Sequence, residues 1–291
     1  MSLPPAASAS PGVRPRSFAA FLEHPALTLR GNRHRRMRAQ NFIVEWIEAG
    51  TEPFEVESTA EMLLIFPDAG AVISPAGQGP GVVVPQAGSV CVLAAGRSSV
   101  RLSAPGTCAV IASHRPDIEP ATVLNEAAYA QPDARIKPTG QPFRRRPGAP
   151  LVQVFDMAQV PAPADNPRLK MLQTDTLSIN WVSYHGVRDR KALSPHSHSD
   201  LEQGSLALAG NFIHHLRVNW GKDANLWRDD EHLAAPSPSL VVVPVDLVHT
   251  TEGVGDGHHL LIDLFSPPRA DFIARGWVHN AGDYSASVTA A

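Results

Sequence analysis

The chain contains one stretch in which metal-ligating residues recur at β-strand spacing: Ser194-Pro195-His196-Ser197-His198-Ser199-Asp200-Leu201-Glu202. In a β-strand the side chains at positions i and i+2 point to the same face, so His196 and His198 present two imidazoles side by side. Glu202 has the same parity and reaches that face if the strand bends after His198. Two nitrogens and one carboxylate meeting at one point form a donor set suited to iron, manganese, nickel or zinc.

A fourth ligand is expected from another strand, and His249 is the best candidate. The apolar run Leu240–Val243 is a core strand, and Pro244 ends it. Asp246 can adopt the tight turn that follows, so His249 begins the next strand at the barrel wall. We therefore predict one divalent metal ion per chain, with iron(II) as first choice and manganese, nickel or zinc as alternatives, held by the following residues: His196, His198, Glu202 and His249.

These residues resemble the two sequence motifs of the cupins, which are small β-barrels of jelly-roll topology. The first motif is His-x-His-x(3,4)-Glu-x(6)-Gly and the second is Pro-x-Gly-x-x-His, and the resemblance implies the same four ligands over residues 151–272. The sequence departs from the motifs at three turn positions: Arg190 replaces a glycine before the first histidine, Gly210 comes one residue late, and Asp246 replaces the glycine of the second motif.

The rest of the chain has the pattern of an all-β protein. Runs of four to seven apolar and β-branched residues are separated by turn residues, and 27 prolines and 21 glycines suit short strands better than long helices. Residues 38–50 read as a strand or a short helix at the start of folded structure. The clearest runs in the first half are these: Glu61–Phe66, Gly81–Pro85, Ser89–Ala95 and Cys108–Ala112.

A second series of such runs begins at Leu151, after a proline-rich segment. We therefore expect two jelly-roll (cupin) β-barrels joined by a Pro-rich linker, a bicupin whose duplication is inferred from layout alone. Residues 86–96 resemble a second cupin motif, but no histidine lies between Thr51 and Ala112, so the first barrel is expected to hold no metal. The expected division is a disordered extension over 1–37, a degenerate barrel over 38–114, a linker over 115–150, the metal-binding barrel over 151–275 and a tail over 276–291.

Composition limits the classes of partner. The net charge of −3 argues against a nucleic-acid or membrane binder, because either would need a basic face. No apolar stretch reaches the ~18–20 residues that span a bilayer. Two cysteines without metal-type spacing fit a reducing cytoplasm. The Pro/Ala/Ser-rich residues 1–22 are read as an extension rather than a transit peptide, and the resemblance to cupins implies a homodimer.

Four further residues are weak catalytic candidates: Tyr184, His215, Arg217 and Glu231. His215 and Arg217 share parity and could line the pocket as a carboxylate-binding pair, although the pattern favours a surface pair on a two-layer sheet. Tyr184 precedes the ligands on a strand and is either a core residue or a substrate contact. The charged segment 228–232 is either a lid or a solvated turn.

Three readings of function remain open. The first is a metal-dependent enzyme acting on a small oxygenated molecule, with a dioxygenase as the first choice of reaction. The second is a non-oxidative metal-dependent isomerase, decarboxylase or lyase, which would need a general base near the metal. The third is a small-molecule binding or sensing protein without catalysis.

Overall fold

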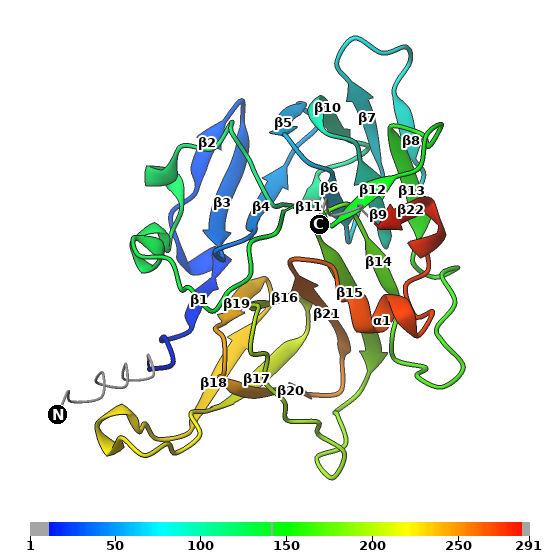
Figure 1. Cartoon of the computed structure of the whole chain (residues 1–291). Helices are drawn as coiled ribbons and strands as arrows, with labels where there is room; N and C mark the ends of the chain where they lie inside the picture. Colours follow the sequence, from blue (N-terminus) through cyan, green and yellow to red (C-terminus); the bar gives the residue numbers. More distant parts are fainter. Residues whose placement is uncertain (1–11, 141, 287–291) are drawn as a thin grey trace, which may run out of the picture.

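The structure, a computed structural model, describes residues 12–140 and 142–286 (Figure 1). It is built almost entirely of β-strands, which form two barrels that pack against each other. This architecture agrees with the all-β, two-barrel fold predicted from the sequence. Among the described residues, no helix is long and apolar enough to cross a membrane.

The N-terminal barrel consists of a seven-stranded and a four-stranded antiparallel sheet. In spatial order, the larger sheet contains β13 (Val152–Asp156), β9 (Ser89–Leu93), β6 (Met62–Phe66), β11 (Gly106–Ala112), β4 (Ile43–Ala49), β3 (Asn32–Arg38) and β2 (Leu27–Leu29). The smaller sheet contains β5 (Phe54–Ser58), β10 (Gly96–Leu102), β7 (Ala71–Pro75) and β8 (Val82–Val84).

The C-terminal barrel has a six-stranded and a three-stranded sheet. The larger contains β1 (Ser17–Ala20), β19 (Ser239–Val243), β16 (Gln203–Ala209), β21 (His258–Phe265), β15 (Ser178–His185) and β14 (Met171–Gln173). The smaller contains β18 (Glu231–Pro236), β17 (Asn211–Arg217) and β20 (Val248–Val254). The helical elements are short: η1 (Phe21–Glu23), η2 (Pro120–Thr122), η3 (Glu126–Tyr129), η4 (Ala224–Leu226), α1 (Ala270–Ala274) and η5 (Ala281–Asp283).

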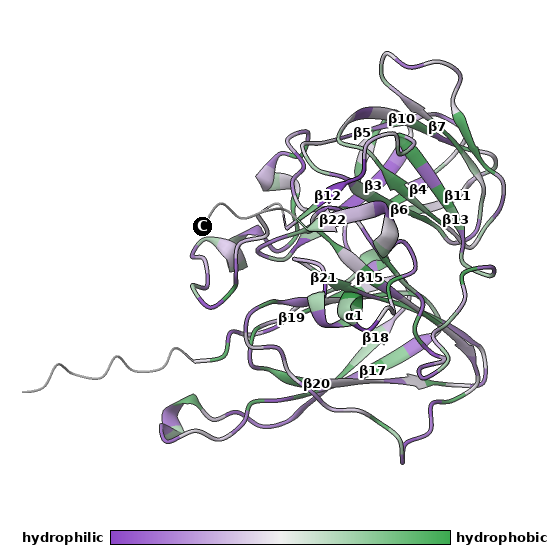
Figure 2. Ribbon diagram, turned by 45° about the vertical axis from the view of Figure 1, so that its right-hand side comes forward, coloured by the Kyte–Doolittle hydropathy of each residue, from purple (hydrophilic) through white to green (hydrophobic). Residues whose placement is uncertain are grey.

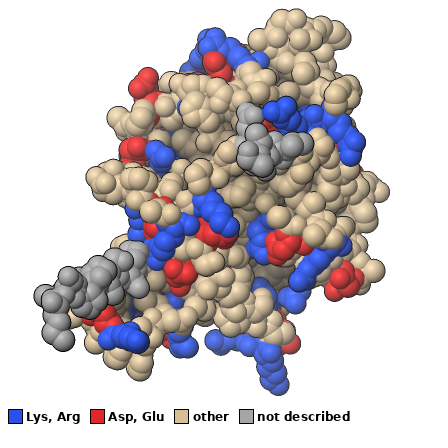
Figure 3. Space-filling model, viewed as in Figure 1, with Lys and Arg blue, Asp and Glu red and all other residues tan. Residues whose placement is uncertain are grey.

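The two large sheets pack face to face, and strand alternation divides their side chains between separate cores. In β6, Leu63 and Ile65 point into the core between the barrels, whereas Met62, Leu64 and Phe66 fill the N-terminal barrel. Apolar residues therefore occupy both faces of these central strands, which Figure 2 colours largely green for hydrophobic residues. On the face drawn in Figure 3, basic and acidic side chains are interspersed over the surface.

The six-stranded sheet of the C-terminal barrel differs in one respect, because part of its inner face is polar. Ile179 and Trp181 on β15 belong to the core between the barrels, while Asn180 between them lines a cavity. The same alternation places Gln203 on β16 and Asp263 on β21 in the cavity wall. The apolar face of this sheet packs against the N-terminal barrel, and this packing fixes the position of the polar side chains on the opposite face.

Each barrel includes one strand from the other half of the chain. β1 pairs with β19 of the C-terminal barrel, and β13 pairs with β9 of the N-terminal barrel. The expected disordered extension over 1–37 is therefore wrong for its described part, since Ala19 and Phe21 are buried between the barrels and Phe21 stacks on Trp46. Residues 1–11 lie outside the described part of the chain. The expected start of the second barrel at 151 is also wrong, because β13 completes the first.

The linker and the tail pack on the barrels. Asn125 in the linker exchanges hydrogen bonds with the backbone of Arg38, and β12 (Phe143–Arg145) pairs with β22 (Tyr284–Ala286) from the tail. The tail expected over 276–291 thus contributes a strand, and the ring of Tyr284 is buried. Residues 287–291 lie outside the described residues.

A reciprocal contact between Glu61 and Asp175 joins the two barrels. The Glu61 N–H donates to the Asp175 carboxylate (3.1 Å), and the Asp175 N–H donates to the Glu61 carboxylate (3.0 Å). Glu61 also accepts hydrogen bonds from Arg145 (2.9 Å) and from the hydroxyl of Tyr284 (2.8 Å). Burial, and secondarily the negative charge of Glu61, raise the pKa of Asp175 to about 6.

We predict that Asp175→Asn removes a pH dependence of stability. Because the folded pKa lies above the unfolded value, ionisation of Asp175 lowers stability as the pH rises from about 4 to 6, and the loss is complete above that range. Asparagine keeps the acceptor oxygen without the charge. At pH 7 the variant should melt about 2–4 °C higher than wild type, corresponding to ~1 kcal/mol. Thermal melts from pH 4 to 8 test this; a lower Tm for the variant at pH 7 would contradict it.

Candidate metal centre

A backbone bridge joins His196, in the segment before β16, to His249 at the start of β20. The N–H of His196 donates to the carbonyl of His249 (3.0 Å), and the N–H of His249 donates to that of His196 (2.8 Å). Asp246 makes the preceding turn with a φ of 65°, in the left-handed region that glycine would occupy in the cupin motif. Its N–H donates to the carbonyl of His198 (2.7 Å), so the turn holds the second histidine as well.

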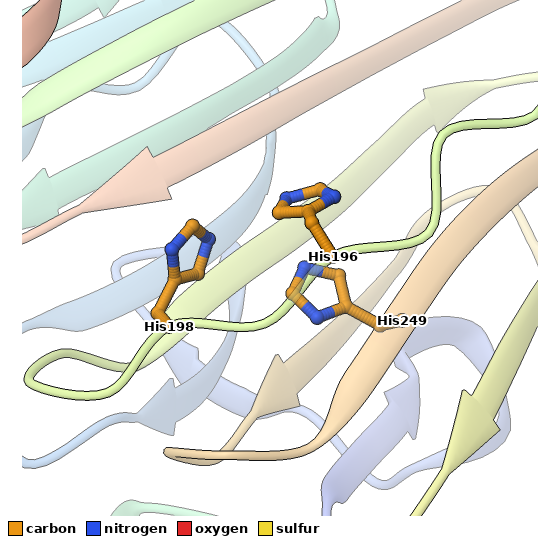
Figure 4. Close-up of side chains that lie close together, drawn as sticks. All are labelled: His196, His198 and His249. Atoms are coloured by element: carbon orange, nitrogen blue, oxygen red, sulfur yellow. The ribbon is translucent and has the colours of Figure 1, made fainter.

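The three histidines converge on one point (Figure 4). Each offers a ring nitrogen, and these nitrogens lie within 4.8 Å of one another; among the described residues this is the one such group of three or more metal-ligating side chains. The ring of His249 is buried, that of His198 is half-buried and His196 is exposed to the cavity side. The cluster could therefore hold a metal ion that remains reachable from the cavity.

Backbone carbonyls fix the protonation of two of these rings. His196 Nδ1 lies 2.9 Å from the carbonyl of Ser194, and His249 Nδ1 lies 3.0 Å from that of Leu247. A carbonyl only accepts, so Nδ1 carries the proton and Nε2 presents a lone pair, the arrangement that second-shell contacts impose on metal-ligating histidines. Burial lowers the pKa of His249 to about 3 and that of His198 to about 4, which keeps both rings neutral at pH 7.

The predicted fourth ligand, Glu202, does not join the cluster. Its carboxylate accepts hydrogen bonds from the Gln40 N–H (2.6 Å) and the Tyr129 hydroxyl (3.0 Å), both outside the C-terminal barrel. β16 begins at the next residue, and adjacent residues of a strand face opposite ways. Gln203 therefore points to the histidines, and the expectation of Glu202 as a ligand is corrected.

Gln203 presents its amide oxygen to the histidines. The oxygen Oε1 lies 3.0 Å from His198 Nε2 and 3.1 Å from His249 Nε2, while the amide nitrogen donates to Asp263 (3.0 Å). Since His249 Nε2 carries no proton, two lone pairs face each other across this contact. A bound cation would satisfy both, so the residues present fit a divalent ion, with neutral imidazole and amide donors typical of iron, manganese, nickel or zinc.

The cluster opens into a cavity of about 570 Å³ inside the C-terminal barrel. Its wall combines apolar side chains with polar groups that reach the interior from several strands and loops. The apolar part includes Val182, Phe212, Leu261, Phe265 and Phe272. The polar part includes Arg168, Asn180, Tyr184, Arg188, Thr251, Asp263 and Arg269.

Of the four weak catalytic candidates, the structure places one in this cavity, namely Tyr184. His215 and Arg217 lie on the opposite face of β17 from the buried Phe212 and Leu216, so the expected carboxylate-binding pair is wrong for this cavity. His215 bonds to Glu252 (3.0 Å), and Arg217 pairs with Asp230.

Glu231 pairs with Arg16 near the N-terminal segment, away from the cavity. The charged segment 228–232 likewise contributes nothing to the cavity wall, which removes the basis for a lid over the metal cluster. Sequence reasoning also missed Gln203, Asp263 and Arg188. The signal that could have found the first two is a polar residue at an inward position of a strand that is otherwise apolar.

Comparison with known proteins supports the fold. Oxalate decarboxylase from Bacillus subtilis at pH 4.6 superimposes with a TM-score of 0.60 and 10% identity over 90% of this chain and 79% of that one. AerE from Microcystis aeruginosa gives a TM-score of 0.50 and 8% identity over 88% of this chain and 98% of that one. No family model and no curated protein matches the sequence. At such low identities the likeness concerns the cupin fold alone.

The contacts of Glu202 predict that its carboxylate stabilises the fold and does not act at the histidine cluster. Glu202→Ala leaves the partly buried Gln40 N–H and Tyr129 hydroxyl without an acceptor, so the free energy of unfolding should fall by about 1–3 kcal/mol. Tyr129→Phe removes only one of the two bonds and should cost less. Denaturant unfolding of both variants tests this; an unchanged midpoint for Glu202→Ala would contradict the role.

Proposed function

We propose that the chain is a metal-dependent cupin enzyme that acts on a small oxygenated organic molecule, with a dioxygenase as the first choice of reaction. The observation that supports this most directly is the convergence of three imidazoles, two with tautomers set by backbone carbonyls, on one side of a cavity. A purely structural site would be closed by its ligands, whereas this cluster faces an open volume.

The charge of the donor atoms affects which substrates the metal site would bind. Three imidazoles and an amide oxygen carry no charge, so a divalent ion bound there would keep its full charge toward the cavity. Such an ion would supply Lewis acidity and, as iron(II), redox chemistry with molecular oxygen. A substrate with adjacent oxygen atoms, such as a hydroxy-keto acid or a catechol-like ring, suits a site of this kind.

The side chains around the cluster have separable roles in this proposal. The amide nitrogen of Gln203 donates hydrogen bonds to Asp263 on β21 and to Ser205 on β16, and these bonds fix the side chain. Phe265 and Phe272 in the wall limit the access of water to the reacting atoms. Tyr184 lines the same cavity with its hydroxyl beside the backbone of Gly253, and in this proposal that hydroxyl binds a substrate oxygen.

A non-oxidative decarboxylase, isomerase or lyase is the second candidate. The specific observation in its favour is that Asp263 and Tyr184, two groups able to carry a proton, both line the cavity. Oxalate decarboxylases among the structural neighbours fit this reading at the level of fold. A non-catalytic binding protein remains a third outcome of the experiments below.

The ligand set predicts the metal content of variants. His196→Ala and His249→Ala should each lower metal affinity by at least about tenfold, because each removes a fixed nitrogen donor. Glu202→Gln should keep the metal, and His215→Ala is the matched control, since His215 lies outside the cavity. Metal analysis of purified proteins with circular dichroism checks this. Full metal content in both His196→Ala and His249→Ala, with the fold intact, would exclude the proposed centre.

Measurements of oxygen uptake distinguish a dioxygenase from a non-oxidative enzyme and from a binding protein. If the dioxygenase proposal holds, protein loaded with iron(II) consumes oxygen when given a substrate from a panel of hydroxy acids, keto acids, diketones and phenols, and His196→Ala does not. Turnover of the same substrate under anaerobic conditions would instead assign the non-oxidative class. Binding without turnover that persists in His196→Ala would identify a binding protein.

A further inference from the structure

The cavity contains a second fixed group besides the histidine cluster, the guanidinium of Arg188. Its Nη1 donates to the carbonyl of Thr251 (2.8 Å) on β20, and its Nη2 lies 3.4 Å from the hydroxyl of Ser194. The backbone N–H of Arg188 donates to the carbonyl of Gly253 (3.2 Å), so the residue is held at both its main chain and its side chain. Arg188 is thus positioned between the segment that leads to His196 and β20, the strand that contains His249.

The charge of Arg188 is not balanced within the described part of the chain. No carboxylate there lies within ion-pair distance of its guanidinium, and its Nε is buried without a hydrogen-bond partner. Burial, and then the positive charge of Arg168, lower the pKa of Arg188. A partly buried guanidinium without a counter-charge is costly, and the cost is relieved when an anion binds.

Two of the three neighbouring arginines, unlike Arg188, are paired with a carboxylate. Arg190, two residues further along the same loop, pairs with Glu252 (3.2 Å). Arg269 pairs with Asp271 (2.7 Å) and lies over the ring of Phe272. Arg168 lines the cavity beside Arg188 and, like it, has no ion pair among the described residues.

The acidic groups of the cavity wall are engaged elsewhere. Asp189 accepts a hydrogen bond from the backbone N–H of Lys191 in its own turn (2.8 Å). Asp263 accepts from Gln203 (3.0 Å) and Ser205 (3.2 Å). Among the described residues neither carboxylate forms an ion pair with Arg188, so its guanidinium remains available to an anion that enters the cavity.

We propose that Arg188 binds the carboxylate of the substrate, with Arg168 adding attraction at the same wall. This inference rests on the proposed function only in placing the metal centre in the same cavity. The planar guanidinium matches a planar carboxylate, and one such group suffices for one negative charge. The substrate class is then a small carboxylic acid with an oxygen donor on the adjacent carbon, an α-hydroxy or α-keto acid.

The test compares Arg188→Met, which keeps an unbranched apolar stem but removes the charge and the N–H donors, with Arg190→Met as the matched control from the same loop. The probes are pyruvate, lactate and oxalate, with pyruvamide as the neutral analogue and inorganic phosphate as a different anion. Affinities are measured by calorimetry on protein with its metal content determined. At least one of the three carboxylates should bind wild type and Arg190→Met, and should bind Arg188→Met about tenfold or more weakly.

Pyruvamide and phosphate should bind wild type more weakly than that carboxylate, and Arg188→Lys, which keeps the charge without the planar fork, should have intermediate affinity. Equal carboxylate affinity in wild type and Arg188→Met, or in wild type and Arg188→Lys if the methionine variant does not fold, would overturn the inference. Binding of none of the three carboxylates to wild type would also overturn it, and tighter binding of phosphate would assign a phosphate site instead.

The failure of this inference can be told apart from failure of the proposed function. If wild type holds no metal but binds carboxylates through Arg188, the metal-dependent enzyme is excluded and the carboxylate site stands. If the metal is present in wild type and in Arg188→Met at equal levels while carboxylate affinity is unchanged, the metal centre stands and the role of Arg188 is wrong.

Discussion

The backbone bridge between His196 and His249 is the constraint on which the candidate centre depends. Its two hydrogen bonds hold the segment before β16 against the start of β20, so residues far apart in the sequence have a fixed separation. The positive-φ turn at Asp246 adds a third bond, to the carbonyl of His198. Because main-chain atoms make these contacts, the imidazoles converge without relying on one another, and a metal ion would find its donors already assembled.

The packing of the two barrels gives this bridge a rigid support. The six-stranded sheet buries one face against the N-terminal barrel, and its other face carries Asn180, Gln203 and Asp263 toward the cavity. Glu202 lies on the face turned toward the N-terminal half, where it binds Gln40 and Tyr129. The first barrel, whose own interior is filled by apolar residues, thus serves as the surface on which the second barrel's site is built.

The sequence was sufficient to predict the all-β fold, the two barrels and the three histidines, because strand alternation and turn chemistry are local properties. It led to Glu202 and missed Gln203, because that choice required a bend after His198, whereas the residue at which β16 begins decides which side chain faces inward. The exchange of β1 and β13 depends on long-range pairing that no local pattern encodes. The position of Arg188 depends on a loop and on its bond to Thr251, which are likewise set by the tertiary fold.

X-ray absorption spectroscopy of the metal-loaded protein at the metal edge tests the central claim most directly. Three imidazole rings should scatter around one ion in wild type and two in His249→Ala, and the spectrum of Glu202→Gln should equal that of wild type. A spectrum that shows fewer than three imidazoles in wild type, or one that changes on substitution of Glu202, would contradict the assignment of the centre.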